Sequence, residues 1–232
     1  MDPILELKGI SKRFGNKVVL EDINLKIFSG EILGLIGRSG CGKSTLIKIL
    51  VGYYQADKGE IIFNGNKIKR DFKEIKKIVG YTTQDNSFYE KLTIQENMYY
   101  YANLYNINKT TRKNRIQEIL KEIDLYNSKD TLAGRISGGM KRRLDFAISL
   151  LHNPKIVILD EPTTGLDPIL VEKFWEMVTK ISKKEGISIL VSSHILSELE
   201  SYCTSAAYME NGRIKHLIKI DNNTKLEREF KK

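Results

Sequence analysis

A glycine-rich segment between two apolar runs constrains this chain more than any other feature of its sequence. Residues 37–45 read GRSGCGKST and fit the pattern GxxxxGK(S/T), which forms a loop around nucleotide phosphates when a strand precedes it and a helix follows it. Residues 31–36 are a short apolar run suited to a buried strand, and residues 44–50 carry apolar side chains at helical spacing. The segment therefore predicts a nucleotide-binding α/β domain of the phosphate-loop type, with ATP or GTP as its ligand. An ordinary glycine-rich turn is the alternative.

The residue types of this loop suit the binding of a triphosphate. The three glycines leave the backbone free to curl with its N–H groups inward, and the positive end of the following helix points to the same place. Lys43 can reach the β- and γ-phosphates, and the Ser44 hydroxyl can ligate the Mg²⁺ ion that accompanies them. We predict ATP-binding roles for the whole loop: Gly37, Arg38, Ser39, Gly40, Cys41, Gly42, Lys43, Ser44 and Thr45.

Composition narrows the class of protein. The 232 residues, 41% of them hydrophobic, can fill the core of one large domain. No run approaches the ~18 apolar residues of a membrane span, the first residues lack the apolar core of a signal peptide, and Cys41 and Cys203 form no CxxC pattern, so we expect a cytoplasmic protein. The net charge of +9 is spread along the chain, with modest clusters at 67–77, 141–143 and 225–232. We therefore expect a solvated basic surface and no nucleic-acid partner.

Periodicity predicts how the chain is organised. Strands at 4–7, 18–27 and 59–63, with a hairpin turn at 14–17, indicate an antiparallel β layer at the N-terminus. A further strand at 78–82 leads to Gln84.

Helical spacing then takes over between residues 92 and 151, and the strand pattern returns afterwards. The predicted helices cover 94–105, 111–123 and 138–151, and strands at 155–159 and 187–191 flank a helix at 168–183. We predict a single domain over 1–232. It comprises an ATP-binding core of mainly parallel sheet (1–86 and 152–220), a helical subdomain (87–151) and a polar tail (221–232) that is either a short exposed helix or frayed.

Two adjacent carboxylates follow a predicted buried strand. Asp160 and Glu161 end the run IVILDE, and ligands bind at the carboxyl edge of an open α/β sheet. Asp160 is suited to hold Mg²⁺ through a water molecule, opposite Ser44, whereas Glu161 projects further and can polarise the water that attacks the γ-phosphate. Caps for the next helix are the alternative role for both acids.

Ser137 opens a predicted helix whose apolar face includes Leu144, so it is placed as an N-cap. The two glycines that follow it cost helix stability, roughly 1 kcal/mol each relative to alanine. Close approach of the backbone to a phosphate is a second reason for glycine at these positions.

Taken together, these motifs resemble those of the ABC-type ATPases, the nucleotide-binding cassettes that drive transporters. That family carries a phosphate loop, a glutamine after a strand, an SGG signature, an Asp-Glu pair, a short GLD-like loop and a histidine after the next strand. This sequence has all six in that order: Lys43 in its loop, Gln84, Ser137-Gly138-Gly139, Asp160-Glu161, Gly165-Leu166-Asp167 and His194. The resemblance spans residues 4–213 and implies the ABC ATPase fold, ATP and Mg²⁺ as ligands, and ATP hydrolysis coupled to transport.

The resemblance also implies a head-to-tail dimer with a second cassette, identical or different, in which each ATP lies between the phosphate loop of one cassette and the Ser137 helix of the other. The signature residues Ser137, Gly138, Gly139 and Met140 would then bind the partner's ATP. Asp167 would contact the partner cassette, with a turn or cap role as the alternative.

The resemblance assigns roles to three further residues. His194 would bond to the γ-phosphate and the attacking water, and Gln84 would sense Mg²⁺ and that water. Phe14 matches the aromatic position that stacks on adenine, where tyrosine is more usual. The alternatives are structural roles for His194 and Gln84, and core packing for Phe14.

Met140 stands where the common signature has glutamine, and residues 161–168 read EPTTGLDP. These features are similar to the subgroup that exports drugs, antibiotics, polysaccharides or lipids. The implied partner is an integral membrane permease subunit, which the family docks on the helical insertion near the tyrosine run 99–101, and the implied location is the cytoplasmic face of the cell membrane. A soluble single-cassette ATPase, such as an iron–sulfur assembly ATPase, and an importer cassette are the alternatives.

Overall fold

Two β-sheets organise the part of the chain that this computed structural model describes, residues 2–68, 72–221 and 223–229. The strand orders are β2-β1-β4-β5 in one sheet and β10-β9-β3-β8-β7-β6 in the other. The strands are β1 (Pro3–Phe14), β2 (Lys17–Phe28), β3 (Ile32–Ile36), β4 (Lys58–Phe63), β5 (Asn66–Lys67), β6 (Val79–Thr82), β7 (Ile156–Asp160), β8 (Ser188–Ser192), β9 (Ser205–Glu210) and β10 (Arg213–Lys219).

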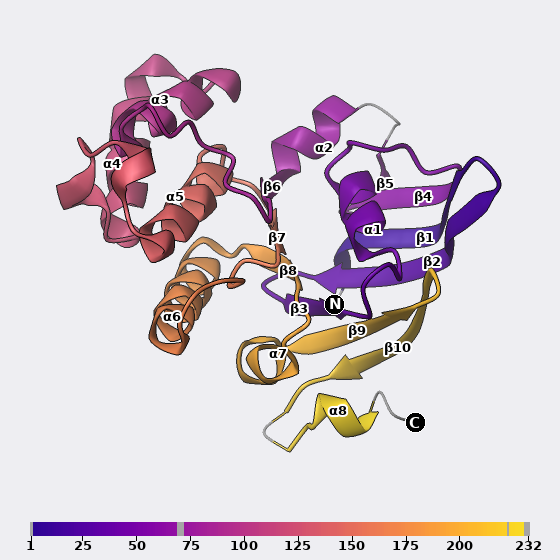
Figure 1. Ribbon diagram of the computed structural model, residues 1–232. Coiled ribbons are helices and arrows are strands. Elements are labelled where there is room, and N and C mark those ends of the chain that lie inside the picture. Colours follow the sequence, from indigo (N-terminus) through magenta and orange to yellow (C-terminus); the bar gives the residue numbers. More distant parts are fainter. Residues whose placement is uncertain (1, 69–71, 222, 230–232) are drawn as a thin grey trace.

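Helices cover the second sheet and form a separate group at one side of the molecule, where α3, α4 and α5 lie away from the antiparallel sheet (Figure 1). The helices are α1 (Lys43–Leu50), α2 (Phe72–Ile78), α3 (Ile94–Leu104), α4 (Lys109–Glu122), α5 (Gly138–Leu150), α6 (Pro168–Glu185), α7 (Leu196–Tyr202) and α8 (Leu226–Glu229), with short 3₁₀ turns at Tyr126–Ser128 and Ala133–Arg135. Among these helices, none has both the length and the apolar character needed to cross a membrane.

The six-stranded sheet is parallel from β9 through β6, and β10 pairs antiparallel with β9 at its edge. Its central strands are apolar runs because both faces are covered: all five residues of β3 and of β8 are buried. The prediction of a mainly parallel central sheet with an antiparallel N-terminal layer and helices inserted between its strands is confirmed.

Successive residues of each central strand belong to two different apolar cores. Leu33 and Leu35 of β3 pack with α1 and the antiparallel sheet. Ile32 and Ile36 of the same strand belong to the core that includes α5, α6 and α7. The sheet therefore separates a phosphate-loop half of the molecule from a helical half, because side chains alternate across a strand.

The N-terminal hairpin is longer than its sequence pattern predicts. The predicted strand at 4–7 extends over all of β1, because β2 pairs with it along its length as far as Phe14 and Lys17. On its other edge β1 pairs with β4. Because β1 pairs through its backbone on both edges, it can include polar residues. Hydrophobic alternation alone did not predict that these residues belong to the strand.

Several elements lie outside the sequence-based expectations. The small residues of β9, the polar ones of β10 and the short helices α2 and α7 gave too little periodicity. The expected tail forms a short helix, α8, in which Glu227 and Arg228 are exposed. Leu226 is fully buried and its N–H donates to Glu200 Oε1 at 2.7 Å, so this one residue docks the helix. Residues 230–232 of that expectation lie outside the described residues.

The helical insertion is fixed by caps and by one bidentate ion pair. A capping box joins Thr93 and Glu96 at the start of α3, and Asn108 caps α4. Arg115 of α4 donates to both oxygens of Glu185 in α6 at 2.9 Å, and also to the Leu150 carbonyl. Such forked contacts define orientation as well as adding energy.

Helix α5 also holds the loop that follows β6. Arg142 donates to the carbonyl of Gln84 at 2.7 Å, and buried Asp145 accepts from the N–H of Ser87 at 3.1 Å and from its hydroxyl. Arg143 donates to the Ile123 carbonyl at 2.9 Å. The expectation of a solvated basic cluster at 141–143 is therefore wrong for these arginines, which bind backbone carbonyls instead.

Asp145 should make the stability of the fold depend on pH. Burial raises the pKa of this carboxyl from its ordinary value of 3.8 to about 6, so the folded state disfavours the ionised form. Stability therefore falls as pH rises from about 4 to about 6. Asp145→Asn should therefore be more stable than the parent at pH 7, by roughly 1–3 kcal/mol, the equivalent of one to two pKa units. Urea unfolding between pH 4 and pH 8 measures this, and the advantage should shrink toward pH 4.

Asp57→Asn serves as a control of opposite sign. Hydrogen bonds from Lys12 and from the Arg13 N–H lower the pKa of Asp57, so this variant should lose stability at neutral pH, and the loss should fade on acidification. An Asp145→Asn variant no more stable than the parent at any pH would contradict the assignment.

Candidate functional site

The phosphate loop joins β3 to α1 and depends on glycine at specific points. A Cβ at position 37 would lie 2.3 Å from the Met209 carbonyl oxygen, and Gly42 has a φ of 111°, which side-chain-bearing residues rarely adopt. The ammonium of Lys43, 9% exposed, donates to the Gly37 carbonyl at 2.5 Å and to the Arg38 carbonyl at 3.4 Å. The loop therefore curls around the charge that is predicted to reach the phosphates.

The turn between β9 and β10 supports this loop from behind. The N–H of Gly212 donates to the carbonyl of Cys41 at 3.0 Å. Cys41 is buried, while Ser44 at the start of α1 is exposed, as are Arg38, Ser39 and Gly40, and Thr45 is half-buried. The exposed side of the loop therefore carries the residues predicted to meet phosphate and metal.

Asp160 ends β7 and is held from both sides. Its Oδ1 accepts from the hydroxyl of Ser192 at the end of β8, and its Oδ2 accepts from the Tyr81 hydroxyl of β6 at 3.4 Å. Burial, and then the charge of Asp160, raises the pKa of the Tyr81 phenol above its ordinary value. Two neighbouring strands thus orient this carboxylate.

Glu161 adopts the left-handed region, with φ of 48°, an uncommon conformation for a residue with a side chain. Its N–H donates to the Ser192 carbonyl at 3.0 Å and to the Ser192 hydroxyl at 3.1 Å. Strain of this kind persists where surrounding contacts determine the backbone and often accompanies function.

Three predicted site residues meet at the Glu161 carboxylate. Gln84 Nε2 lies 3.5 Å from Oε2, and His194 Nδ1 lies 3.6 Å from Oε1. The hydroxyl of Thr164, a residue that the motifs did not single out, donates to Oε2 at 3.4 Å. One amide, one carboxylate and one imidazole ring that could contact a reacting water therefore converge from the ends of β6, β7 and β8.

The signature segment opens α5 as expected. Ser137 is the N-cap and accepts from the Met140 N–H at 3.3 Å, which confirms its predicted cap role. A Cβ on Gly139 would lie 3.1 Å from Leu170, so packing within the chain explains that glycine. A Cβ on Gly138 would meet nothing nearer than 4.0 Å, and Ser137 and Gly138 are both exposed. Nothing within the described chain requires glycine at 138.

The structure bears on the alternative roles of two residues: a cap role for Asp167 and core packing for Phe14. Asp167 caps α6, accepting from the N–H groups of Ile169 and Leu170 at 3.1 and 3.0 Å. Phe14 is 41% exposed at the hairpin end, edge-on to Tyr54, so the core-packing alternative is wrong. The cap role of Asp167 is present, and contact with a partner cassette stays a prediction.

Sequence motifs missed the residues that hold the site together. Ser192 contacts both acidic residues, yet a serine ending an apolar strand gives no distinctive signal. Arg142 fixes the Gln84 loop, but it lies in a basic run that resembles a solvated surface. Both act through contacts between segments far apart in sequence, and no local pattern records such contacts.

The oxygen donors of the site fit Mg²⁺ rather than a softer metal. Ser44 supplies a hydroxyl, Asp160 a carboxylate and Gln84 an amide, which are ligand types that Mg²⁺ accepts while keeping several waters and phosphate oxygens. Among the described residues no group of three His, Cys, Asp or Glu side chains could form an all-protein metal cage. The donor set is therefore of the kind that nucleotide phosphates complete.

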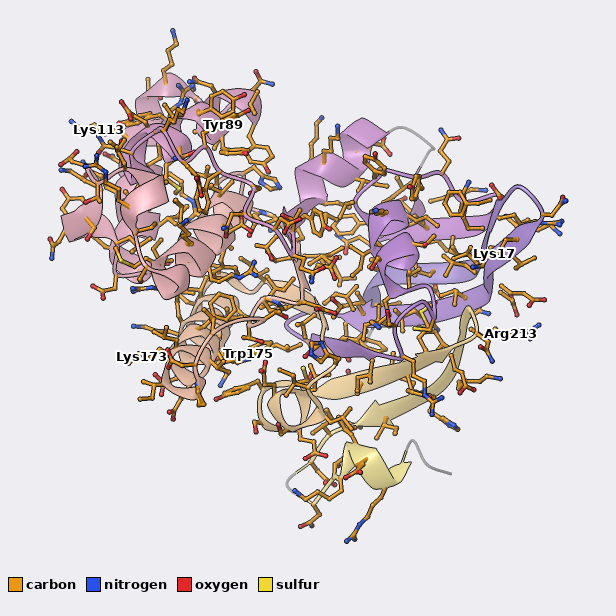
Figure 2. The ribbon with its side chains drawn as sticks, viewed as in Figure 1. Lys17, Tyr89, Lys113, Lys173, Trp175 and Arg213 are labelled. Atoms are coloured by element: carbon orange, nitrogen blue, oxygen red, sulfur yellow. The ribbon has the colours of Figure 1, made fainter. Side chains whose placement is uncertain are left out.

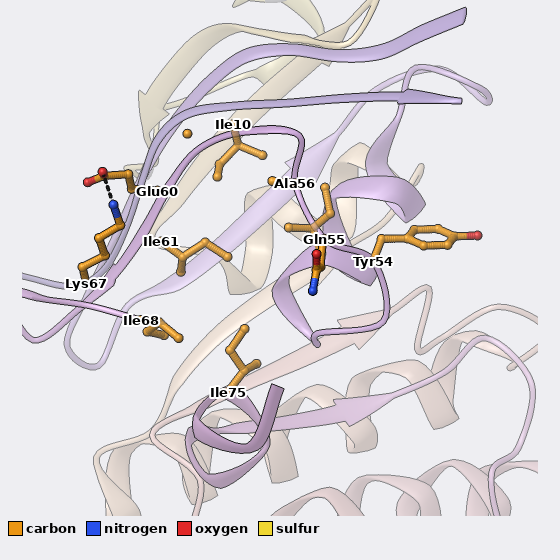
Figure 3. Close-up of a pocket in the computed structure, with 11 residues that line it drawn as sticks. Ile10, Tyr54, Gln55, Ala56, Glu60, Ile61, Lys67, Ile68 and Ile75 are labelled. Carbon is orange, nitrogen blue, oxygen red and sulfur yellow. Dashed lines mark hydrogen bonds and ion pairs between the residues drawn. The ribbon is translucent and has the colours of Figure 1, made fainter. Parts of the chain in front are cut away.

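A small separate cavity of about 110 Å³ lies between the antiparallel sheet, α1 and α2 (Figure 3). Its lining includes Ile10, Ile61 and Ile75, with an ion pair between Lys67 and Glu60 at one side. The lining contains none of the predicted site residues. Polar and apolar residues line this cavity together, and it lies apart from the predicted site.

Comparison with known proteins agrees with this geometry. The family model described as ABC transporter matches residues 20–164. The bacitracin transport ATP-binding protein BcrA of Bacillus licheniformis is 34% identical over 99% of this chain and 74% of its own length. The lantibiotic transport ATP-binding protein SrtF of Streptococcus pyogenes is 35% identical over 98% of this chain and 96% of its own length.

Solved structures share the fold. CbiO1 from Clostridium perfringens, part of the ABC transporter complex cbiONQ, superposes with a TM-score of 0.88 at 27% identity, over 94% of this chain and 89% of its own. An ATP-binding subunit of an ABC transporter gives 0.83 at 31% identity, over 98% and 93%. With its phosphate loop, paired carboxylates and signature helix in place, the chain belongs to the ABC transporter family as an ATP-binding subunit.

Proposed function

We propose that this chain hydrolyses ATP as the cytoplasmic-face subunit of an ABC exporter. The convergence of Gln84, Glu161 and His194 carries the proposal, because it joins a carboxylate to two groups able to orient water. Export is supported by Met140 in the signature and by relatives named for bacitracin and lantibiotic transport. The same relatives favour this function over an iron–sulfur assembly ATPase or an importer cassette.

In the proposed mechanism, the phosphate loop binds and orients the triphosphate while Lys43 exchanges its carbonyl contacts for phosphate oxygens. Ser44, Gln84 and Asp160 would hold a Mg²⁺ ion, whose charge would offset that of the phosphates. Glu161 accepts the proton of the attacking water, and His194 and Gln84 orient that water. Phe14, exposed at the hairpin end, stacks on adenine.

The proposed site is completed by a second cassette. Gly138 lies exposed at the N-terminus of α5, where free N–H groups and the helix dipole favour a γ-phosphate. The open space around it supports close approach by a molecule outside the chain. Ile169, 65% exposed beside Asp167, adds apolar surface to the proposed contact.

A groove of about 1190 Å³ between α1, α2, β6 and α3 is the proposed docking surface for the permease. Tyr53 and Leu104, 71% and 58% exposed, offer apolar surface at its rim. Of the tyrosine run, Tyr101 lines the groove. Lys48, Lys76 and Lys77 add positive charge.

Glu161→Gln should abolish most turnover without preventing binding. The amide cannot accept the proton of water, so hydrolysis should fall by ~10²–10⁴, while ATP affinity persists and an ATP-stabilised dimer accumulates. Phosphate release with Mg²⁺ held constant, together with size-exclusion chromatography, measures both effects. Turnover at the parent rate would rule out Glu161 as the base.

Gly138→Ala and Gly139→Ala should distinguish a glycine needed for the partner's ATP from a glycine needed for packing within the chain. Alanine at 138 meets open space, so thermal stability and ATP affinity should hold, but the added methyl should weaken ATP-dependent dimerisation and lower turnover by about tenfold or more. Alanine at 139 should lower the melting temperature, because Leu170 must move. The dimer assay is done in the Glu161→Gln background. Equal dimerisation by Gly138→Ala and its parent would count against the composite site.

Membrane partnership is tested by purifying the tagged chain from detergent-solubilised native membranes. A copurifying polypeptide with about six ~20-residue apolar spans is expected. Leu104→Asp should reduce its recovery, whereas Leu217→Asp, at a position 55% exposed on β10, should not. Recovery of a soluble partner alone would contradict the exporter assignment.

A further inference from the structure

A buried carboxylate outside the site ties three segments of the chain together. Glu198 of α7 is 8% exposed, and its Oε2 accepts from the Thr163 hydroxyl at 2.7 Å and from the Trp175 indole N–H at 3.1 Å. Thr163 belongs to the loop after β7, and Trp175 to α6. Since burying a carboxylate is costly unless it is hydrogen-bonded, these two donors make its position tenable.

Thr163 is the buried polar anchor of the loop from Glu161 to Asp167. It is 4% exposed, whereas Thr164 and Gly165 beside it are exposed. Within the loop, the Thr164 N–H donates to the Glu161 carbonyl at 3.3 Å, and the Leu166 N–H donates to the Thr163 carbonyl at 3.1 Å. The first of these turns therefore encloses Thr163, and the second starts from it. Thr163 is the residue that Glu198 holds.

The strained backbone at Glu161 needs restraint on both of its sides. Ser192 fixes the N–H of Glu161 on the side of the sheet. On the other side, the Thr164 hydroxyl donates to Glu161 Oε2 at 3.4 Å, and Thr163, two residues along, is anchored to Glu198. Left-handed conformations of this kind persist only where such contacts over-determine them.

We propose that Glu198 is a positioning residue that holds the 161–167 loop, and through it the Glu161 carboxylate, in register for hydrolysis without touching ATP. The proposal rests on the proposed ATPase function. It extends that function to a buried acid that none of the sequence motifs contains. Loss of the anchor should lower the rate of the chemical step and spare ATP binding, because the phosphate loop lies on separate elements.

Trp175 provides a direct view of this network. It is the one tryptophan of the sequence. Its side chain extends from α6 to α7 (Figure 2), where it stacks on Tyr202 with ring centroids 5.1 Å apart. Its indole N–H shares the oxygen that anchors Thr163. Intrinsic fluorescence therefore reports on the surroundings of Glu198 without any label.

Four variants separate positioning from general stability. Glu198→Ala removes the acceptor, and Thr163→Val removes only the loop's bond to it. Glu198→Gln keeps an oxygen that can accept both bonds, and Trp175→Phe removes the other arm of the network while leaving Thr163 bonded. Each is compared with the parent for kcat, KM for ATP, melting temperature and hydrogen exchange of the 161–167 amides.

We expect Glu198→Ala and Thr163→Val to lower kcat by roughly tenfold to a hundredfold, as small misplacements of a reacting group do, with the KM for ATP changed less than about twofold. Exchange of the 161–167 amides should accelerate in both. Glu198→Gln and Trp175→Phe should keep kcat close to that of the parent. In Thr163→Val, which retains Trp175, the fluorescence spectrum should shift.

Two outcomes would overturn the proposal. One is a kcat that follows the melting temperature across all four variants, because that indicates a purely structural role. The other is unchanged exchange of the 161–167 amides in both Glu198→Ala and Thr163→Val. A parent chain without ATPase activity would instead contradict the proposed function, and the exchange rates would still decide whether Glu198 holds the loop.

Discussion

Parallel pairing of β3, β8, β7 and β6 is the constraint on which the site depends. Because parallel strands end at the same edge of a sheet, the pairing brings together the phosphate loop after β3, the two acidic residues after β7 and His194 after β8. Gln84 arrives at the same edge from β6. The phosphate loop, the acidic pair, His194 and Gln84 come from different segments, so the register of the sheet sets their mutual distances.

Sequence alone predicted the parts of this arrangement that have local signals. Glycines in the phosphate loop, apolar runs such as 156–159, and the cap at Ser137 are properties of short segments, and the structure contains each of them. It could not predict β9 and β10, since Ser205 and Ala206 lack the size of typical strand residues and gain their burial from β3. Nor could it assign Ser192 or Glu198, whose partners are distant in the chain.

Helix α5 connects the two ends of the proposed mechanism within one rigid element. Its N-terminus presents Gly138 to the outside, and about one and two turns later Arg142 and Asp145 hold the loop that carries Gln84. A displacement of the helix would therefore move both Gly138 and the loop that carries Gln84. Asp145 links α5 to this loop, and its raised pKa shows that burying the carboxyl group disfavours the ionised form.

The position of β3 in the six-stranded sheet has a consequence for how the protein forms during synthesis. Leu33 pairs with Leu190 on one side and with Ser205 on the other, and both partners come from the opposite end of the sequence. The β1–β2 hairpin can form early from local contacts, but β3 must wait for nearly the whole chain. Since non-local pairing slows folding, the phosphate loop that follows β3 is expected to be among the last parts of the described fold to become ordered.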